Sequence, residues 1–180
     1  MIKEIPHFTD AQILAARPDK NPVDPRRPYA CLLEEEYSDR GYLEKVATIF
    51  LTNRECAFRC LMCDLWRNTT DDSIARGDIP AQIDFAVQEL GIEAALATGE
   101  IGHVKLYNSG NFFDRKAISL DDREQIATLV RRFQTVIVEN HPRLCDSQVV
   151  EFHRQLDDPP RYIRRHIFLH LDLHSFEIDS

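Results

Sequence analysis

The sequence lacks any long apolar run: the longest, from Val46 to Leu51, contains Thr48 and is far shorter than the roughly 18–20 residues that span a bilayer. It also lacks an excess of positive charge, because 22 Lys and Arg face 30 Asp and Glu for a formal net charge of −8. This balance disfavours nonspecific binding to nucleic-acid backbones. The N-terminus has no continuous apolar segment of the secretory type, so we expect a cytoplasmic protein without a transmembrane segment.

The 180 residues are 43% hydrophobic and 29% charged, which is typical of one globular domain with its own core. The cysteines are less ordinary. Three of the five fall within residues 56–63. Because cytosolic thiols are kept reduced, we expect these cysteines to be ligands or catalytic groups, with no disulfide between them.

Residues 1–45 form an expected lead-in and hairpin. Five of the nine prolines occur by position 28, which favours an extended, turn-rich segment with a short helix at Thr9–Ala16. Two apolar, β-branched runs, 29–37 and 42–53, flank the turn signal at 38–41. This pattern predicts a β-hairpin that leads into a buried strand.

Residues 46–156 alternate strands with amphipathic helices. We expect three strands, at 46–51, 104–107 and 135–138, each followed by a helix, beginning near Pro80, at Ser119 with a capping contact to Asp122, and near Asp146. Such alternation predicts an α/β fold with a parallel sheet and right-handed crossovers. The loops 53–66, 108–114 and 139–142 then share the carboxyl edge of the sheet, where α/β proteins carry their chemistry.

Residues 157–180 form a tail of different character. Between His166 and His174, apolar and polar residues alternate, which predicts a fourth strand. The His-x-Asp-x-His pattern of His170, Asp172 and His174 also fits a metal site, but we favour a strand with a solvated edge.

The cysteine loop carries the main functional signal. Cys56, Cys60 and Cys63 have the spacing C-x3-C-x2-C, directly after the first expected parallel strand. Three thiolates on one short loop can ligate three irons of a 4Fe-4S cluster, because protein thiolates are the usual ligands of such clusters. The fourth iron would then lack a protein ligand and stay open to another molecule. An open iron in a cleft points to catalysis.

This motif in its β/α context resembles the radical S-adenosylmethionine (radical SAM) superfamily. The segments Leu51-Thr-Asn-Arg-Glu-Cys56, Cys63-Asp-Leu-Trp66, Lys105-Leu-Tyr-Asn-Ser-Gly-Asn-Phe-Phe-Asp114 and Val138-Glu-Asn-His-Pro142 resemble the elongator-like branch, which includes an archaeosine-synthase-like subgroup. The resemblance covers roughly residues 30–155. It implies a partial (β/α) barrel of about three to four β/α units with an N-terminal β-hairpin extension.

The resemblance also implies roles for individual residues. Cys56, Cys60 and Cys63 would hold the 4Fe-4S cluster, whose open iron binds S-adenosylmethionine. The turn formed by Asn108, Ser109 and Gly110 would receive the methionyl amino group through its backbone carbonyls. Glu139, after the third strand, stands where the family has a polar residue near the cofactor. Met62 occupies a usually aromatic position that packs near the adenine, and its thioether can supply such packing.

The implied reaction is reductive cleavage of S-adenosylmethionine to methionine and a 5′-deoxyadenosyl radical, which abstracts a hydrogen atom from the substrate. It requires a reductant protein of the flavodoxin or ferredoxin type. The implied substrate is tRNA or another nucleotide-containing molecule. At roughly 30 residues per unit, a six-unit partial barrel needs about 190 residues, whereas about 135 follow the lead-in. The resemblance fades after Leu156, so we expect an incomplete, C-terminally truncated barrel or one completed by a partner chain.

Several alternatives remain open from the residues alone. The three cysteines could form a structural zinc site with Cys31, Cys145, His103 or His141 as the fourth ligand, and the chain would then be a non-catalytic metal-binding subunit. An inactive fragment of a radical SAM enzyme is a further alternative. Cys31 and Cys145 also fit simple core packing, and Glu139 fits a capping or ion-paired acid. Trp66 fits a packing anchor of the loop.

Overall fold

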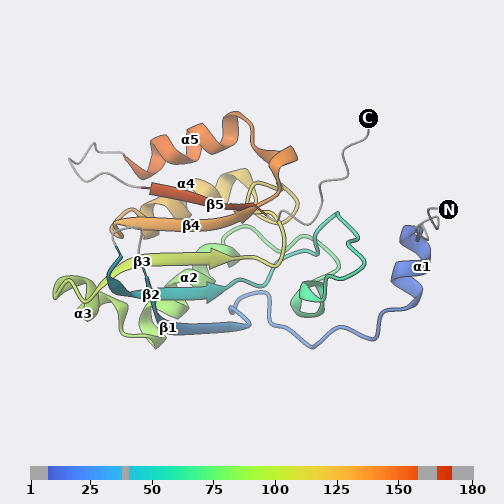
Figure 1. Ribbon diagram of the computed structural model, residues 1–180, viewed down its shortest axis with the longest axis horizontal. Helices are drawn as coiled ribbons and strands as arrows, with labels where there is room; N and C mark the ends of the chain where they lie inside the picture. The colour runs from blue at the N-terminus through green and yellow to red at the C-terminus, as the bar shows by residue number, and fades with distance from the viewer. Residues whose placement is uncertain (1–7, 38–40, 158–165, 172–180) are drawn as a thin grey trace.

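A mixed β-sheet forms the centre of the chain. The structure is a computed structural model that describes residues 8–37 and 41–157 and the backbone of 166–171. The strand order is β1-β2-β3-β4-β5 (Figure 1). β1 pairs antiparallel with β2, and the remaining neighbours pair in parallel. The strands are β1 (Ala30–Tyr37), β2 (Leu43–Phe50), β3 (Ile101–Tyr107), β4 (Thr135–Asn140) and β5 (His166–Leu171).

The N-terminal hairpin and the α/β alternation are therefore confirmed. β1 and β2 lie within the two predicted runs, and their register sets Ala30 opposite Phe50 and Tyr37 opposite Leu43. The predicted strand in the tail is β5, which pairs in parallel with β4 from Thr135↔His166 to Asn140↔Leu171. The proposed metal pattern in the tail cannot be followed further, since Asp172 and His174 lie outside the described residues.

The helices either precede β1 or connect the parallel strands. They are α1 (Asp10–Ala15), α2 (Asp78–Glu89), α3 (Ile92–Ala97), α4 (Leu120–Val130) and α5 (Ser147–Leu156), with 3₁₀ turns at Leu65–Asn68 and Pro142–Leu144. The predicted helix starts are confirmed, because Pro80 lies in the first turn of α2, while Ser119 and Asp146 accept backbone hydrogen bonds as N-caps of α4 and α5. Among the described residues, no helix has the length and apolarity needed to cross a membrane.

The expected capping contact at α4 is present, and its acid has a second role. The backbone N–H of Asp122 donates to the Ser119 hydroxyl at 3.1 Å, as the sequence predicts. The Asp122 carboxylate accepts from the backbone N–H of Gly77 at 2.8 Å, on the segment that begins α2. The acid therefore joins two neighbouring helices at their N-terminal ends.

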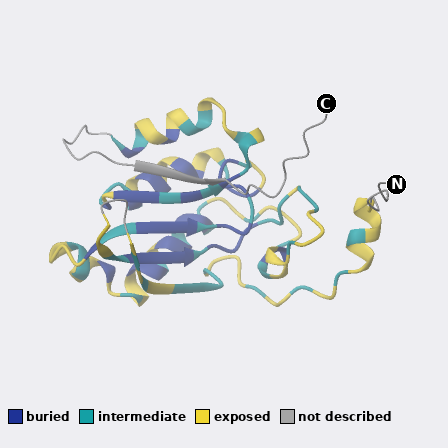
Figure 2. Ribbon diagram, in the orientation of Figure 1, coloured by how far each residue is buried: buried dark blue, intermediate teal, exposed yellow. Residues whose placement is uncertain are grey.

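The core lies between the sheet and the layer of α2, α4 and α5, which covers one face of the sheet (Figures 1 and 2). Alternate residues of three adjacent strands point into it: Ala47 and Ile49 of β2, Val104 and Leu106 of β3, and Val136 and Val138 of β4. Because β2, β3 and β4 run in parallel, the loops that follow them emerge at one edge. The predicted convergence of the three polar loops at this edge is confirmed.

Candidate functional site

The exit of β2 is fixed by a buried amide. The backbone N–H of Thr52 donates to Oε1 of Gln82, and Nε2 of Gln82 donates to the carbonyl oxygens of Thr52 and Pro25, all at 2.7 Å. Gln82 is fully buried on α2. The sequence analysis did not single it out, although a polar residue three positions after Ile79 and four before Ala86, on the apolar stripe, is the signal that could have found it. The cysteine loop thus leaves the sheet in a set direction.

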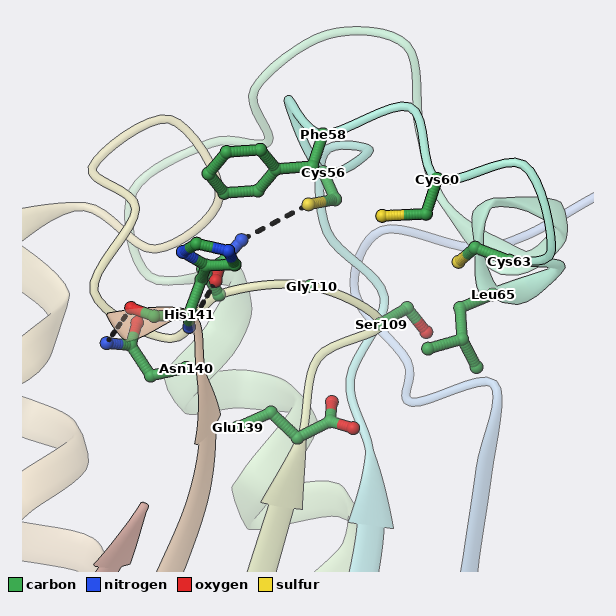
Figure 3. A pocket seen from close by; sticks show the side chains of 11 residues that line it. Cys56, Phe58, Cys60, Cys63, Leu65, Ser109, Gly110, Glu139, Asn140 and His141 are labelled. Atoms are coloured by element: carbon green, nitrogen blue, oxygen red, sulfur yellow. Dashed lines mark hydrogen bonds between the residues drawn. The ribbon is translucent and has the colours of Figure 1, made fainter. Parts of the chain in front are cut away.

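The three predicted ligand cysteines line one pocket. Cys56 and Cys63 are partly buried and Cys60 is exposed, and all three are free thiols. The pocket has a volume of about 230 Å³ and is bounded by the loops after β2, β3 and β4. Figure 3 shows the cysteine loop above the turn that carries Ser109 and Gly110, with Glu139 at the end of β4. The remaining lining residues are Phe58, Leu65, Asn111, Asn140 and His141.

Two predicted cofactor residues do not line this pocket. Met62 is 77% exposed and lines a separate groove between the cysteine loop and α1, together with Phe8 and Ile13. Asn108 is fully buried behind the pocket, and neither polar atom of its side chain has a hydrogen-bond partner. Its backbone N–H donates to Oε2 of Glu139 at 3.1 Å, which joins the ends of β3 and β4.

The turn after β3 approaches the cysteine loop closely. Ser109 has a φ of 51°, and among the described residues it is the only non-glycine with a positive φ. Its hydroxyl shares a 3.1 Å hydrogen bond with the hydroxyl of Tyr29, which the sequence analysis did not select. A Cβ on Gly110 would stand 3.1 Å from Cβ of Cys56, which is tighter than ordinary contact, so this close approach favours glycine. A left-handed backbone at a residue other than glycine, as at Ser109, is common at functional sites.

Asn111 connects the two sides of the pocket. Its Nδ2 donates to Sγ of Cys56 at 3.1 Å, and its Oδ1 accepts from the backbone N–H of His141 at 2.6 Å. The side chain is 4% exposed. The sequence placed Asn111 in a polar loop without a role, because a contact across 55 residues has no local signal. It is the direct polar neighbour of a candidate ligand sulfur.

Aromatic contacts hold the ends of the cysteine loop. Phe58 stacks on the ring of His141 with centroids 4.3 Å apart. Nδ1 of His141 accepts from the backbone N–H of Arg143 at 3.1 Å, which fixes the imidazole orientation. Trp66 is buried, and its indole N–H donates to the carbonyl oxygen of Cys63 at 3.0 Å. The prediction that Trp66 is a packing anchor is confirmed.

The other residues considered as zinc ligands lie elsewhere, except one. Cys31 is on β1 opposite Ile49, and His103 pairs with Glu44 at 2.8 Å on a separate groove near the amino edge of the parallel strands. Cys145 accepts from Nδ2 of Asn140 at 3.3 Å without lining the pocket. Only His141 shares the pocket with the three cysteines.

The electrostatics favour the protonated thiol of Cys56 over its thiolate. Burial raises the pKa of the Cys56 thiol, a backbone hydrogen bond at Phe58 opposes this, and the neighbouring Cys60 and Cys63 raise it further. A thiol of this kind stays protonated at neutral pH and is a poor nucleophile. It becomes a ligand when a metal displaces its proton. Cys56 is therefore better suited to binding a metal than to acting as a catalytic nucleophile.

Within the described ranges, no three His, Cys, Asp or Glu side chains are grouped closely enough to hold one metal ion. The thiols surround a cavity and do not converge on a point. No protein-family model, no curated protein and no solved structure matches this chain.

Proposed function

We propose that the chain is a radical SAM enzyme core whose cysteines Cys56, Cys60 and Cys63 hold a 4Fe-4S cluster. One observation carries the proposal: three thiols from a single loop line a pocket with Ser109, Gly110 and Glu139 at the carboxyl edge of a parallel sheet. A cluster has its irons at separate corners, so its thiolates need not converge as the ligands of one zinc ion must. The observed spread of the thiols favours a cluster over zinc.

The donor set fits the first cofactor directly. Thiols are the usual protein ligands of iron-sulfur clusters, and an amide donor at Cys56 Sγ is a common way of tuning their potential. The cavity of about 230 Å³ is smaller than the roughly 300–1,000 Å³ of typical ligand pockets. It suits a compact cluster, and S-adenosylmethionine would extend beyond it along the carboxyl edge.

The finer fold proposal is a partial (β/α) barrel of three to four units. The run of parallel strands β2-β3-β4-β5, connected by helices on one face, supports it. In such barrels the reacting groups lie in the loops after the strands. The proposed substrate, tRNA or another nucleotide-containing molecule, and the proposed flavodoxin- or ferredoxin-type reductant follow from the family resemblance alone.

The chain's own residues bind and orient. When bound, the cluster and S-adenosylmethionine supply one-electron chemistry that ends in a carbon radical able to abstract hydrogen. The loop contributes three thiolates, and Asn111 donates a hydrogen bond to the Cys56 sulfur. Glu139 accepts the N–H of Asn108 and so holds the turn whose backbone carbonyls would receive the amino group of S-adenosylmethionine. Phe58, stacked on His141, forms one apolar side of the cavity.

Anaerobic reconstitution of the full chain with iron and sulfide tests the proposal. We expect a broad absorbance band near about 400 nm and about four irons per chain. Addition of reductant and S-adenosylmethionine should then give 5′-deoxyadenosine. A colourless protein with one zinc per chain would instead establish the metal-binding-subunit alternative. A loaded cluster without 5′-deoxyadenosine would identify an inactive fragment.

The matched variants are Cys60→Ala and Cys145→Ala. Cys60 lines the pocket with the other ligand candidates, whereas Cys145 lies outside it. We expect Cys60→Ala to lose cluster retention and Cys145→Ala to keep it, measured as iron per chain after desalting. Equal iron loss in both variants would contradict the ligand assignment.

A further inference from the structure

The lead-in crosses the outside of the cysteine loop. We call residues 8–28 the strap; it comprises α1 and the segment that leads from α1 toward β1, and it lies at the same end of the molecule as that loop (Figure 1). Its helix α1 has no buried residue. The strap is therefore held to the rest of the chain mainly through specific polar contacts.

Two of these contacts, both ion pairs, meet at one carboxylate. Glu55, directly before Cys56, pairs with Arg17 Nη1 at 2.7 Å and with Lys20 Nζ at 2.8 Å, both from the strap. It also pairs with Arg59, which lies inside the cysteine motif and donates to the carbonyl oxygen of Cys56 at 2.8 Å. The Glu55 side chain is only 12% exposed. Cations of the strap and of the loop thus share one anion.

The strap also contacts the C-terminal end of the cysteine loop. The backbone N–H of Asn21 donates to the carbonyl oxygen of Arg67, and its Nδ2 donates to Oδ1 of Asn68, each at 2.8 Å. The Arg17 guanidinium lies 4.7 Å from the ring centroid of Trp66. Trp66 in turn bonds the carbonyl of Cys63. Both ends of the cysteine motif are therefore connected to the strap.

We propose that Glu55 is a positioning residue through which the strap orders the cysteine loop for its metal cluster. The cluster part of this inference rests on the proposed function. Between Leu51 and Leu65 the loop has no regular helix or strand, so its ordering costs conformational entropy. Partly buried ion pairs are screened less by water than exposed ones, and a shared anion lowers the entropy cost per contact. The strap supplies this order before the cluster binds.

The test uses the full chain in its metal-free state and two variants on opposite sides of the contact, Glu55→Gln and Arg17→Met. Trypsin cleavage at Lys20–Asn21 reports strap opening, and alkylation of Cys56 mapped by mass spectrometry reports loop opening. Both rates should rise about tenfold in each variant, as expected for loss of a partly buried ion pair. Glu55→Asp, which keeps the charge, should restore most of the protection.

The control is Glu93→Gln, which removes the pair between Arg132 and the largely exposed Glu93 of α3, away from the loop. It should leave both rates unchanged. Faster strap cleavage with unchanged Cys56 alkylation would overturn the inference, because the strap would then open without releasing the loop. Unchanged rates in Arg17→Met would overturn it as well.

A second measurement separates positioning from a simple charge effect. In reconstituted protein, Glu55→Gln removes a negative charge near the cluster and Arg17→Met removes a positive one. Positioning predicts faster iron loss to a chelator in both variants, with no further acceleration in the double variant. Effects of opposite sign would show that only charge matters and would refute positioning. If wild-type protein holds no cluster, the proposed function fails, and the metal-free rates still decide the role of Glu55.

Discussion

Replacement of Gly110 by alanine should lower the free energy of unfolding by an amount that the contact distances set. The added Cβ would lie 3.1 Å from Cβ of Cys56 and 3.6 Å from its Cα, whereas ordinary contacts begin at 3.4 Å. The cysteine must therefore shift by a few tenths of an ångström. Overpacking of this kind costs about 1–3 kcal/mol. Alanine also lowers the conformational entropy of the unfolded chain, which stabilises the fold by about 0.4–1 kcal/mol. We expect a net loss near 1 kcal/mol, because the rigid neighbour outweighs the entropy gain.

Gly102→Ala on β3 is the matched control. Its Cβ would first meet the Gln134 side chain at 3.4 Å, which can move aside, so the entropy gain should dominate. Urea unfolding of metal-free protein measures both free energies, and iron content after reconstitution measures the effect on Cys56. We expect Gly110→Ala to lose stability and iron while Gly102→Ala stays at or above wild type. Equal stability of the two variants would refute the close approach of Gly110 to Cys56.

Variants at two further positions, Asn111 and Tyr29, test contacts around the pocket. Asn111→Leu should cost about 1–3 kcal/mol in urea unfolding, because the backbone N–H of His141 loses its acceptor. Asn111→Asp keeps an acceptor and loses the donor to Cys56, so it should lower iron retention with a smaller loss of stability; equal stability losses would contradict this separation. Burial raises the pKa of the Tyr29 hydroxyl above 10.0, the Ser109 hydrogen bond opposes this and Glu139 adds to it. The stability due to this group is complete below pH 10 and is lost as the pH rises through its higher folded-state pKa. The free energy of unfolding of Tyr29→Phe should therefore fall less with rising alkaline pH than that of wild type. The same alkaline pH dependence in both proteins would contradict this.

Local patterns were sufficient to predict much of the fold. The stripe of Ile83, Ala86 and Val87 is buried as its spacing requires, and Ser119 caps its helix through its own hydroxyl. These features depend on residues within one or two turns, so a sequence displays them directly. The shared edge of the polar loops followed from strand order alone, because parallel strands end on the same side. The short helix α3 was not predicted, since its six residues are too few for a periodic signal.

The connections within the site could not be read from the sequence. Gln82 reaches Pro25 across 57 residues and Asn111 reaches Cys56 across 55, and only the fold brings these groups together. The position of Met62 shows the same limit. Sequence similarity assigned it to the cofactor, whereas its side chain lines the outer groove beside α1. Neighbouring residues of one loop can face opposite sides, and their spacing in the sequence does not reveal which side each side chain faces.

The two walls of the cysteine pocket differ in how they are anchored. On one side, Phe112 and Phe113 are buried against Phe152 of α5, with ring centroids 5.0 and 6.0 Å away, and the backbone N–H of Phe112 bonds the carbonyl of Glu139 at 2.8 Å. On the other side, the loop exposes Leu61 to solvent and is bounded outside by the strap. The position of the Ser109 wall is therefore set by the hydrophobic core, whereas the position of the cysteine wall depends on its polar contacts with the strap. A substitution in the strap should therefore alter one wall of the pocket and leave the other wall unchanged.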